Sequence, residues 1–496
     1  MIFKSTRNPN LSVNSKEALL KGISPEGGLF VPENFPKSGS VSYMIDMEYK
    51  DIAYYILGKF LTDFTPEELS YCVNSAYDDK FKTSFIAPLH KADNRYFIEL
   101  YHGRTSAFKD MALSILPYFM EVSLKQEKSF DEIVILTATS GDTGKAALEG
   151  FKDVENIKIA VFFPETGVSA TQKSQMQTQE GENVYVLGIH GNFDDCQTAV
   201  KNIFANKELA DNLDIERIRL SSANSINIGR LIPQIVYYFN SYKLLLKYNE
   251  INQDEKINIV VPTGNFGNIL AAYYAKMMGL PVNNLICASN ENNILTDFIN
   301  TGIYDANRDL KVTTSPSMDI LVSSNLERFL YHISDEDTNL VNDLMENLNK
   351  NRYYKLPENL MEKMEFLQGY YATEEEANEK IRTTLKNEDY LIDPHTAVAS
   401  VCYDKYLSEN KDNHKTIIAS TASPYKFSSA MLKALNIDDE TLDDFEKMEK
   451  LYELSNMKIP NNLIGLRDKE VRFTNHVDKE DILDNLNKFI KGDLNA

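Results

Sequence analysis

The sequence predicts an α/β protein built from two parallel-sheet α/β subdomains, with a further N-terminal domain of mixed structure. From residue 133 onward, short β-rich runs alternate with helical stretches, and this alternation is typical of βαβ units and parallel sheets. A long polar and helical region, residues 191–255, separates the β-rich runs into two groups. Two subdomains with a ligand cleft beyond the carboxyl ends of their strands are the simplest arrangement. The predicted strands are 133–136, 157–163, 184–187, 257–261, 285–288 and 417–419.

The order of these patterns along the chain indicates its domain organisation. Residues 1–90 combine helical patterns with a glycine-containing turn and are predicted to form the N-terminal domain. Residues 91–437 form the main α/β region, in which a smaller subdomain, about 112–225, is inserted into the larger one. Residues 438–496 are acidic and lysine-rich, and we expect a peripheral C-terminal extension. Thr373 is followed by three glutamates, which predicts a capped and solvent-exposed helix start.

The composition is that of a globular protein with two or three domains. Of the 496 residues 43% are hydrophobic and 25% charged, and the net charge of −21 disfavours nucleic acid or an anionic membrane as partner. The four cysteines contain no C-x-x-C pair, so neither a disulfide framework nor a metal site is predicted. No apolar run approaches the roughly 18 residues of a membrane-spanning helix. We expect a cytoplasmic protein that binds a small molecule as a monomer or homodimer.

A single lysine stands where a polar loop meets an apolar helix. Lys109 follows the loop 102–108, and the apolar residues after it recur at helical spacing, so it is predicted to lie in the first turn of a packed helix. The helix dipole and burial both disfavour an ammonium there, which biases the amine toward its neutral, nucleophilic form. Such a lysine can form a Schiff base. Taken alone, the stretch also fits a lysine whose stem packs while its ammonium reaches water.

A loop of unusual chemistry follows the first predicted strand. Residues 137–144 connect strand 133–136 to a helix expected to begin near Lys145. This strand-turn-helix arrangement aims hydroxyls and backbone N–H groups at one point, where an anion binds. A substrate carboxylate is the natural guest, although a tight turn capped by a serine or aspartate side chain would have much the same sequence.

Two further loops follow strands of the second group. Residues 262–268 open the apolar helix 269–278, and two glycines with successive N–H groups at a helix N-terminus form a phosphate cradle. The loop has neither the GK[ST] ending of a nucleoside-triphosphate loop nor a GxGxxG pattern. It therefore predicts a site for the phosphate of a smaller cofactor, with a merely structural turn as the alternative. The third loop, 420–427, places hydroxyls directly after strand 417–419.

A Schiff-base lysine, a phosphate loop, a carboxylate loop and a terminal hydroxyl are the parts needed to hold pyridoxal 5′-phosphate. In the same chain order, the sequence resembles the threonine synthases, a family of fold-type II pyridoxal-phosphate enzymes. The resemblance implies that the two α/β subdomains have the fold-type II arrangement and that 91–437 is the catalytic region. The motifs that carry it are Ser5-Thr6-Arg7, Gly27 to Glu33, His102-Gly103, Phe108-Lys109-Asp110, Ser140 to Gly144, Ser222 to Asn227, Gly264 to Gly267, Ser315 to Ile320, Asp393 to Ala399 and Thr421 to Pro424.

The resemblance implies a role for each matching position. Lys109 would hold the cofactor covalently, and Thr421 would meet its pyridine nitrogen. A hydroxyl there, unlike a carboxylate, does not force protonation of the ring. The substrate carboxylate would be received by Ser140, Gly141, Asp142 and Thr143, and the cofactor phosphate by Gly264, Asn265, Phe266, Gly267 and Asn268. The family often has Pro-Thr-Leu where this chain has Arg104-Thr105-Ser106, which affects the loop before the lysine.

The reaction implied by the resemblance is the conversion of O-phospho-L-homoserine and water to L-threonine and phosphate, by β,γ-elimination and replacement, in threonine biosynthesis. A related pyridoxal-phosphate phospholyase, or a threonine or serine dehydratase, could keep nearly all of these cofactor residues. A non-catalytic protein that binds a phosphate-containing ligand is the alternative of another class, and the intact Lys109 argues against it.

The substrate phosphate is a dianion and needs cations. Arginine suits a bidentate clamp better than lysine does. Arg230 follows the polar segment 224–227 and precedes a helix that carries aliphatic residues. Asn227 and Arg230 share one helical face, so both are predicted to point into the cleft and bind substrate. A surface arginine in an ordinary salt bridge is the alternative, and Arg104 is a second candidate for the clamp.

Overall fold

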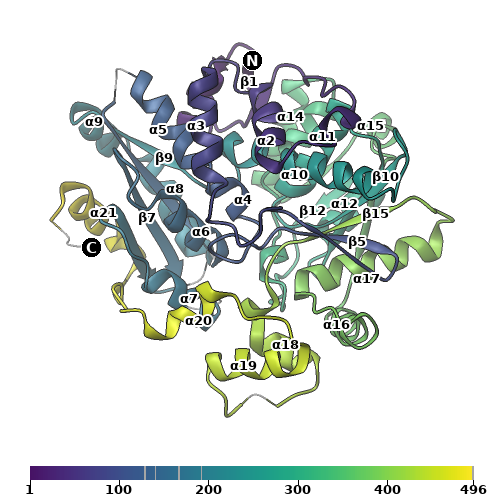
Figure 1. Cartoon of the computed structure of the whole chain (residues 1–496). Helices are drawn as coiled ribbons and strands as arrows, with labels where there is room; N and C mark the ends of the chain where they lie inside the picture. The colour runs from purple at the N-terminus through teal and green to yellow at the C-terminus, as the bar shows by residue number, and fades with distance from the viewer. Residues whose placement is uncertain (128–129, 140, 166–167, 192, 439, 494–496) are drawn as a thin grey trace.

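Two separate β-sheets organise the chain, and the long helix α10 (Ile228–Lys247) lies between them (Figure 1). The computed structural model describes residues 1–493 except 128–129, 140, 166–167, 192 and 439. Eighteen of the residues of α10, Ile228 to Leu245, are buried. A helix that is covered on every side serves as a common core element, and α10 packs against α2 (Tyr49–Gly58), α4 (Asp110–Leu113) and α11 (Gly267–Met278).

The larger sheet has six strands in the order β14-β11-β10-β15-β5-β4. All neighbours are parallel except β4 and β5, which are antiparallel. The three strands predicted in this part of the chain are confirmed as β10, β11 and β15, whereas β4, β5 and β14 were not predicted. The strands are β4 (Leu89–Ala92), β5 (Arg95–Glu99), β10 (Ile257–Pro262), β11 (Val282–Ser289), β14 (Leu367–Tyr371) and β15 (Thr416–Ser420).

The smaller sheet has five parallel strands in the order β16-β8-β7-β6-β9. The three strands predicted from the first group of β-rich runs are confirmed as β6, β7 and β8. β9 lies inside the region that was expected to be polar and helical, and β16 comes from the C-terminal part of the chain. The strands are β6 (Glu132–Ala138), β7 (Ile157–Pro164), β8 (Val184–Ile189), β9 (Ile218–Ser222) and β16 (His476–Val477).

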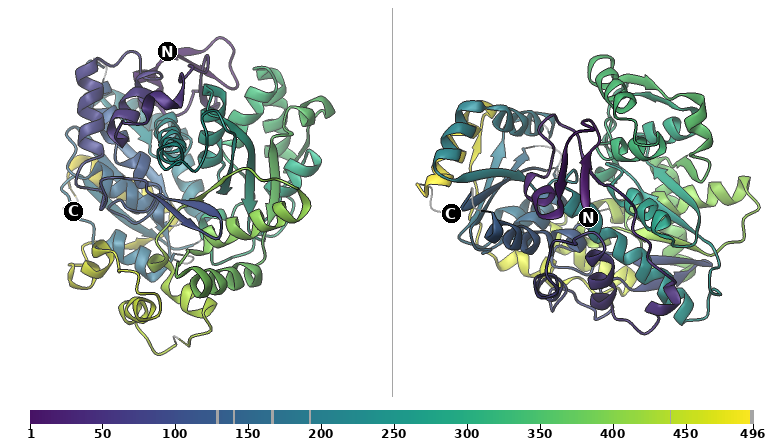
Figure 2. Two further views of the ribbon diagram at one scale, coloured as in Figure 1. Left: turned by 45° about the vertical axis from the view of Figure 1, so that its right-hand side comes forward. Right: turned by 90° about the horizontal axis from the view of Figure 1, so that it is seen from above.

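Helices connect the parallel strands, as βαβ units require, so the α/β fold class predicted from the sequence is confirmed. Figure 2 shows helices on both sides of the sheets. Those of the first half are α1 (Ser15–Lys21), α3 (Pro66–Ala76), α5 (Leu116–Gln126), α6 (Asp142–Phe151), α7 (Ala170–Gln177), α8 (Phe193–Ala205) and α9 (Lys207–Ile215). Those of the second half are α12 (Ile294–Thr301), α13 (Leu326–Ile333), α14 (Thr338–Asn351), α15 (Glu358–Glu362), α16 (Glu374–Glu388), α17 (Pro394–Glu409), α18 (Ser428–Ala434), α19 (Asp444–Ser455), α20 (Asn461–Ile464) and α21 (Ile482–Lys491).

Two helices near the predicted site begin at residues other than expected. Lys109 is the N-cap of the four-residue helix α4 and not a first-turn residue, and the chain resumes as α5 at Leu116. Pro117 explains the interruption, because proline has no N–H to donate and fits only the first turn of a helix. α6 begins at Asp142 and not near Lys145. The predicted capping box at Thr373 is confirmed at the start of α16.

The C-terminal residues cross from the larger part of the molecule to the smaller sheet, as the yellow segment of Figure 1 shows. β16 adds a parallel strand beside β8. On the way, the Asn462 side chain is hydrogen-bonded to the Ser106 hydroxyl and accepts a hydrogen bond from Lys82 Nζ. The expectation of a peripheral extension therefore missed these contacts, because a two-residue strand has no sequence pattern that can be recognised.

The N-terminal residues form a three-stranded antiparallel sheet in the order β2-β1-β3, with β1 (Ile2–Ser5), β2 (Ser12–Asn14) and β3 (Phe30–Pro32). A second small sheet pairs β12 (Ile303–Asp305) with β13 (Tyr353–Lys355). Arg328 of α13 ties the N-terminal sheet to the rest of the molecule. Its fully buried guanidinium donates to the carbonyl oxygens of Phe30 and Ile226 at 2.9 and 2.6 Å and to Asn325 Oδ1 at 2.5 Å.

Replacing Arg328 with methionine should lower the free energy of unfolding by about 3 kcal/mol or more, because three buried oxygen atoms lose their donor at roughly 1–3 kcal/mol each. The measurement is the urea midpoint of unfolding. Lys350→Ala is the matched control, since it removes only an exposed ion pair with Glu346 and should leave the midpoint nearly unchanged. Equal midpoints for both variants would show that the three acceptors find other donors.

Candidate active site

Lys109 is held at the carboxyl end of β15 by a short backbone pairing. Residues 106–108 run antiparallel to residues 421–423, with Phe108 N donating to the Thr421 carbonyl at 2.8 Å and Ser423 N donating to the Ser106 carbonyl at 3.0 Å. β15 lies inside the larger sheet, between β10 and β5. The pairing therefore places Lys109 beyond the carboxyl ends of parallel strands, which is where such sheets bind ligands.

The side chain of Lys109 is buried and has few partners. Its Nζ lies 3.4 Å from Ser317 Oγ and 3.7 Å from Asp142 Oδ2. Burial lowers the pKa of Lys109 to about 8, the charges of Lys426 and Arg230 act in the same direction, and Asp142 opposes them. A lysine with this pKa is partly neutral near physiological pH, so it can act as a nucleophile and as a base.

Asp142, at the start of α6, lies between two lysines. Lys426 Nζ contacts Asp142 Oδ1 at 2.5 Å, and Gln172 Nε2 donates to the same oxygen at 2.7 Å. Burial alone would raise the pKa of Asp142, but Lys426 and Lys109 hold it well below its usual range. The Asp142 side chain is therefore an ionised carboxylate, and only its backbone N–H is suited to bind a substrate carboxylate.

In the loop before α6, the hydroxyl of Thr139 occupies two of the backbone N–H groups that could otherwise bind an anion. Thr139 Oγ1 accepts hydrogen bonds from Gly141 N at 3.0 Å and from Gly144 N at 2.9 Å. The N–H groups of Asp142 and Thr143 lie in the first turn of α6, where a helix leaves its N–H groups without intrahelical acceptors. An anion at this helix start could therefore be bound by the backbone N–H groups of Asp142 and Thr143. Ser140, also predicted to bind the carboxylate, lies outside the described residues.

The glycine-rich loop at the start of α11 has the form of an anion cradle. Phe266 is the N-cap in the left-handed conformation, with no side-chain cap on the helix. A Cβ at Gly264 would lie 2.2 Å from the Ser317 carbonyl oxygen, whereas one at Gly267 would meet no neighbour closer than 3.6 Å. Asn268 Oδ1 accepts from Tyr237 and Tyr238, which leaves its buried Nδ2 without an acceptor among the described residues. The side chain of Asn265 is exposed.

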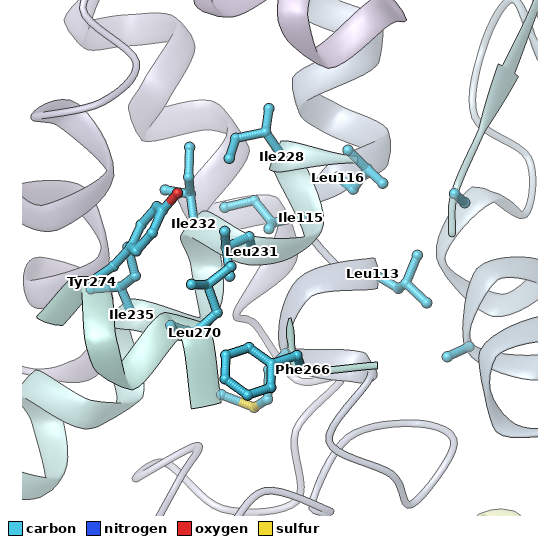
Figure 3. Packing of buried hydrophobic residues seen from close by; sticks show 14 of the residues in the cluster. Leu113, Ile115, Leu116, Ile228, Leu231, Ile232, Ile235, Phe266, Leu270 and Tyr274 are labelled. Atoms are coloured by element: carbon cyan, nitrogen blue, oxygen red, sulfur yellow. The ribbon is translucent and has the colours of Figure 1, made fainter. Parts of the chain in front are cut away.

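Buried apolar side chains pack next to this loop and to the helix that follows Lys109. Figure 3 shows Phe266 near Leu270 of α11 and Leu231 of α10, with Leu113 of α4 further to the right, and all four belong to one cluster of buried apolar residues. The Phe266 side chain belongs to this core, with 2% of its surface exposed. Of this predicted cofactor-binding residue, only the backbone is therefore available to a phosphate.

Arg230 is buried and not on the surface, and its charge acts on Lys109. Arg230 Nη1 donates to the Ala223 carbonyl at 2.6 Å, and its Nε has no acceptor among the described residues. Burial lowers the pKa of Arg230 to about 10, without an opposing contribution from a carboxylate. The alternative of an ordinary surface salt bridge is wrong. A buried guanidinium with an unused donor fits an anionic ligand.

The other two residues predicted near the substrate have different roles. The Asn227 side chain is the N-cap of α10, accepting from Gly229 N at 2.9 Å, and its amide donates to the Leu19 and Ser222 carbonyls. Its prediction as a substrate ligand was wrong, because both polar ends of the amide are bonded to the backbone. Arg104, the second candidate clamp, is half-exposed and pairs with Glu149 at 3.3 Å.

Sequence reasoning gave no role to the residues that position Ser317. His395 Nδ1 lies 2.8 Å from Asp393 Oδ1, and Ser317 N donates to His395 Nε2 at 3.3 Å. These contacts hold Ser317 between Lys109 and the glycine-rich loop. His395 and Asp393 were quoted only as part of a family motif, and their chain position far from Lys109 concealed the contact. Thr421 is also at the site, since its carbonyl oxygen accepts from Phe108.

Comparisons with known proteins cover nearly the whole chain. Family models match residues 2–77 (threonine synthase N terminus), 86–421 (pyridoxal-phosphate dependent enzyme) and 396–490 (threonine synthase, C-terminal). The threonine synthase of Eremothecium gossypii is 32% identical over 517 residues, covering 97% of this chain and 96% of that protein. The structure of pyridoxal-phosphate-bound threonine synthase from Brucella melitensis matches with a TM-score of 0.88 and 32% identity over 100% of both chains.

Human threonine synthase-like 1 is 40% identical over 439 residues, which are 85% of this chain but 58% of the human protein. The chain thus spans less than two thirds of the length of this relative. The model over residues 86–421 includes most strands of both sheets and the lysine site, and it places the chain among the pyridoxal-phosphate-dependent enzymes. Within that class, the family models for the two ends of the chain and the relatives matched over their full length are all threonine synthases. The chain belongs to the threonine synthase family.

Pyridoxal 5′-phosphate is the cofactor of this class, and the residues present fit it. Lys109 supplies a buried amine of lowered pKa. The uncapped start of α11 and the unused Asn268 Nδ2 supply donors for a phosphate. The reactive amine and the phosphate donors come from different parts of the chain, and pyridoxal 5′-phosphate needs both.

Gly264→Ala should weaken cofactor retention, because the new Cβ would overlap the Ser317 carbonyl oxygen and displace the phosphate loop. The measurement is the ratio of near-visible to 280 nm absorbance after dialysis, which we expect to fall, because weaker binding leaves less cofactor on the protein. Gly465→Ala is the control, since no atom lies within 4 Å of its added Cβ. Full cofactor retention by Gly264→Ala would mean that cofactor binding does not depend on the close contact between Gly264 and the Ser317 carbonyl oxygen.

Proposed function

We propose that this protein converts O-phospho-L-homoserine and water into L-threonine and phosphate. The observation that carries the proposal is the buried Arg230, which lacks a carboxylate partner among the described residues and whose charge acts on a lysine of lowered pKa. A dehydratase for an unphosphorylated amino acid has no use for such a cation. The names of the full-length relatives support the same reaction.

Each step requires a group that this chain supplies. Pyridoxal phosphate, when bound, supplies an electron sink for negative charge at the α-carbon of an amino acid. Lys109 would take the proton from Cα and move protons at the neighbouring carbons, for which a pKa of about 8 is suited. The N–H groups of Asp142 and Thr143 would bind the substrate carboxylate. Arg230 would bind the phosphate that leaves.

The cofactor would be held by residues of three separate loops. The backbone of Gly264 to Gly267 and the Asn268 amide would bind its phosphate, and the Thr421 hydroxyl would face its ring nitrogen. A neutral hydroxyl leaves the ring nitrogen free to stay unprotonated, which limits side reactions at the α-carbon. Water is the second substrate, and the buried surroundings of Lys109 limit its entry.

The proposal places the enzyme in the cytoplasm, as a monomer or homodimer with small-molecule partners. No helix within the described part of the chain is long and apolar enough to cross a membrane. The acidic net charge of −21 supports the expectation that nucleic acid is not a partner.

Product identification is the test of the reaction. Purified protein incubated with O-phospho-L-homoserine should release L-threonine and phosphate in equal amounts. A 2-oxo acid with ammonia would instead identify a phospholyase or dehydratase that uses the same lysine. A colourless protein without near-visible absorbance would favour the non-catalytic alternative.

Lys109→Ala should abolish turnover, because the covalent attachment point and the proton carrier are lost together. Borohydride reduction of the unmodified protein, followed by peptide mapping, should find the cofactor on Lys109. Lys145 is the internal comparison, because it is also buried but is paired with Glu149 and Gln179. Cofactor on Lys145 would exclude the assignment of Lys109.

Arg230→Ala should reduce kcat/KM for O-phospho-L-homoserine by about 10- to 100-fold, because a charge-assisted contact of roughly 1.5–3 kcal/mol is lost. Inhibition by homoserine, which has no phosphate, should barely change. The two measurements separate a phosphate contact from a general loss of structure. Equal losses for the substrate and for homoserine would show that Arg230 serves only to support α10.

A further inference from the structure

Lys426 is a second buried lysine at the site, and the proposed reaction gives it no role. It lies in the 3-10 turn Pro424–Phe427, directly after the residues that pair with the loop before Lys109. None of its side-chain surface is exposed. Its Nζ contacts two oxygen atoms, Asp142 Oδ1 at 2.5 Å and the Thr105 carbonyl at 3.0 Å. Because it is fully covered, it has no surface left for a substrate.

The two lysines compete for one carboxylate. Lys426 contacts Asp142 Oδ1 at 2.5 Å, whereas Lys109 is 3.7 Å from Asp142 Oδ2. Gln172 adds a donor to the oxygen on the Lys426 side, at 2.7 Å. The carboxylate is therefore bound mainly by Lys426. An ion pair inside a protein is much stronger than the same pair in water, so the pairing of Asp142 with Lys426 withholds that stabilisation from a protonated Lys109.

We propose that Lys426 is a positioning residue that acts on Lys109 through Asp142, by holding the Asp142 carboxylate so that this charge does not stabilise a protonated Lys109. Without Lys426, the buried Asp142 would have Lys109 as its nearest cation. Lys109 would then remain an ammonium, which has no lone pair to attack a carbonyl or to accept a proton. The inference rests on the proposed function only in naming Lys109 as the reactive amine.

The other charged groups near Lys109 do not replace this effect. Arg230 of α10 adds a positive charge, and Asp110 of α4 adds a negative one. Asp110 is engaged elsewhere, since its Oδ2 accepts from Thr105 N at 2.8 Å and its Oδ1 from the Thr105 hydroxyl at 2.6 Å. Asp142 is thus the carboxylate in direct reach of Lys109, and Lys426 is its partner.

The test measures the proton affinity of Lys109 in the full-length chain after hydroxylamine has removed the cofactor. Acetic anhydride is applied in a pH series, and peptide mapping gives the pH midpoint of labelling for each lysine. For the unmodified protein we expect a Lys109 midpoint near its pKa of about 8. In Lys426→Met the midpoint should rise by a full unit or more, which is a roughly tenfold slower labelling at pH 7.

Two further variants show whether Asp142 transmits the effect. In the double variant Lys426→Met/Asp142→Asn, labelling of Lys109 at pH 7 should return to within about threefold of the unmodified protein, or about half a pH unit. Asp142→Asn alone should label faster than the unmodified protein, because the carboxylate nearest to the Lys109 amine is then gone. This single variant also tests the proposal if Lys426→Met does not fold.

Lys145 provides the control within every map, because its neighbours are Glu149 and Gln179 and it lies on the same helix as Asp142. Its midpoint should stay constant. An unchanged Lys109 midpoint in Lys426→Met, a full upward shift that persists in the double variant, or slower labelling in Asp142→Asn would each overturn the proposal. None of these outcomes depends on which reaction the enzyme catalyses, so they are distinct from a failure of the proposed function.

Discussion

The backbone pairing of residues 106–108 with residues 421–423 is the contact on which the rest of the site depends. It fixes a loop from the first quarter of the chain against the end of β15 in the larger sheet. Lys109 is thereby placed near Ser317 and Asp142, which come from two other parts of the chain. Backbone hydrogen bonds need no particular side chain, which explains how the loop keeps its place although Arg104 and Ser106 differ from the Pro-Thr-Leu that the family often has.

The electrostatic surroundings of Lys109 and Asp142 have opposite effects on charge: they favour a neutral lysine and an ionised aspartate. Around Lys109, burial and neighbouring cations favour a neutral amine. Around Asp142, a lysine and a glutamine amide favour an ionised carboxylate. The two groups are only 3.7 Å apart, and yet burial alone would shift both away from their charged forms. The two groups differ in their favoured charge state because Asp142 is ion-paired to Lys426 and hydrogen-bonded to Gln172, whereas Lys109 has no such close partner among the described residues.

The parts of this structure that could be predicted from sequence are those with local patterns. β10 and β15 consist largely of apolar residues, and the glycine-rich loop follows β10 closely in the sequence. β9 could not be recognised, because its sequence is short, polar and only partly buried. Asn227 was assigned wrongly because helical spacing identifies a face but not the neighbours that cover it. Lys426 and His395 were missed because their partners are distant in the chain and only folding brings them together.

The path of the C-terminal segment has a consequence for how the protein is made. Both sheets can pair most of their strands before residues 462–477 are synthesised, since those strands lie earlier in the chain. Until then, the outer edge of β8 stays open and Ser106, three residues before the reactive lysine, lacks its contact with Asn462. An open strand edge is a template for pairing with other chains. A chain truncated before residue 462 would therefore have most strands of both sheets, but it would lack the Asn462 contact beside its lysine and would leave the edge of β8 open to other chains.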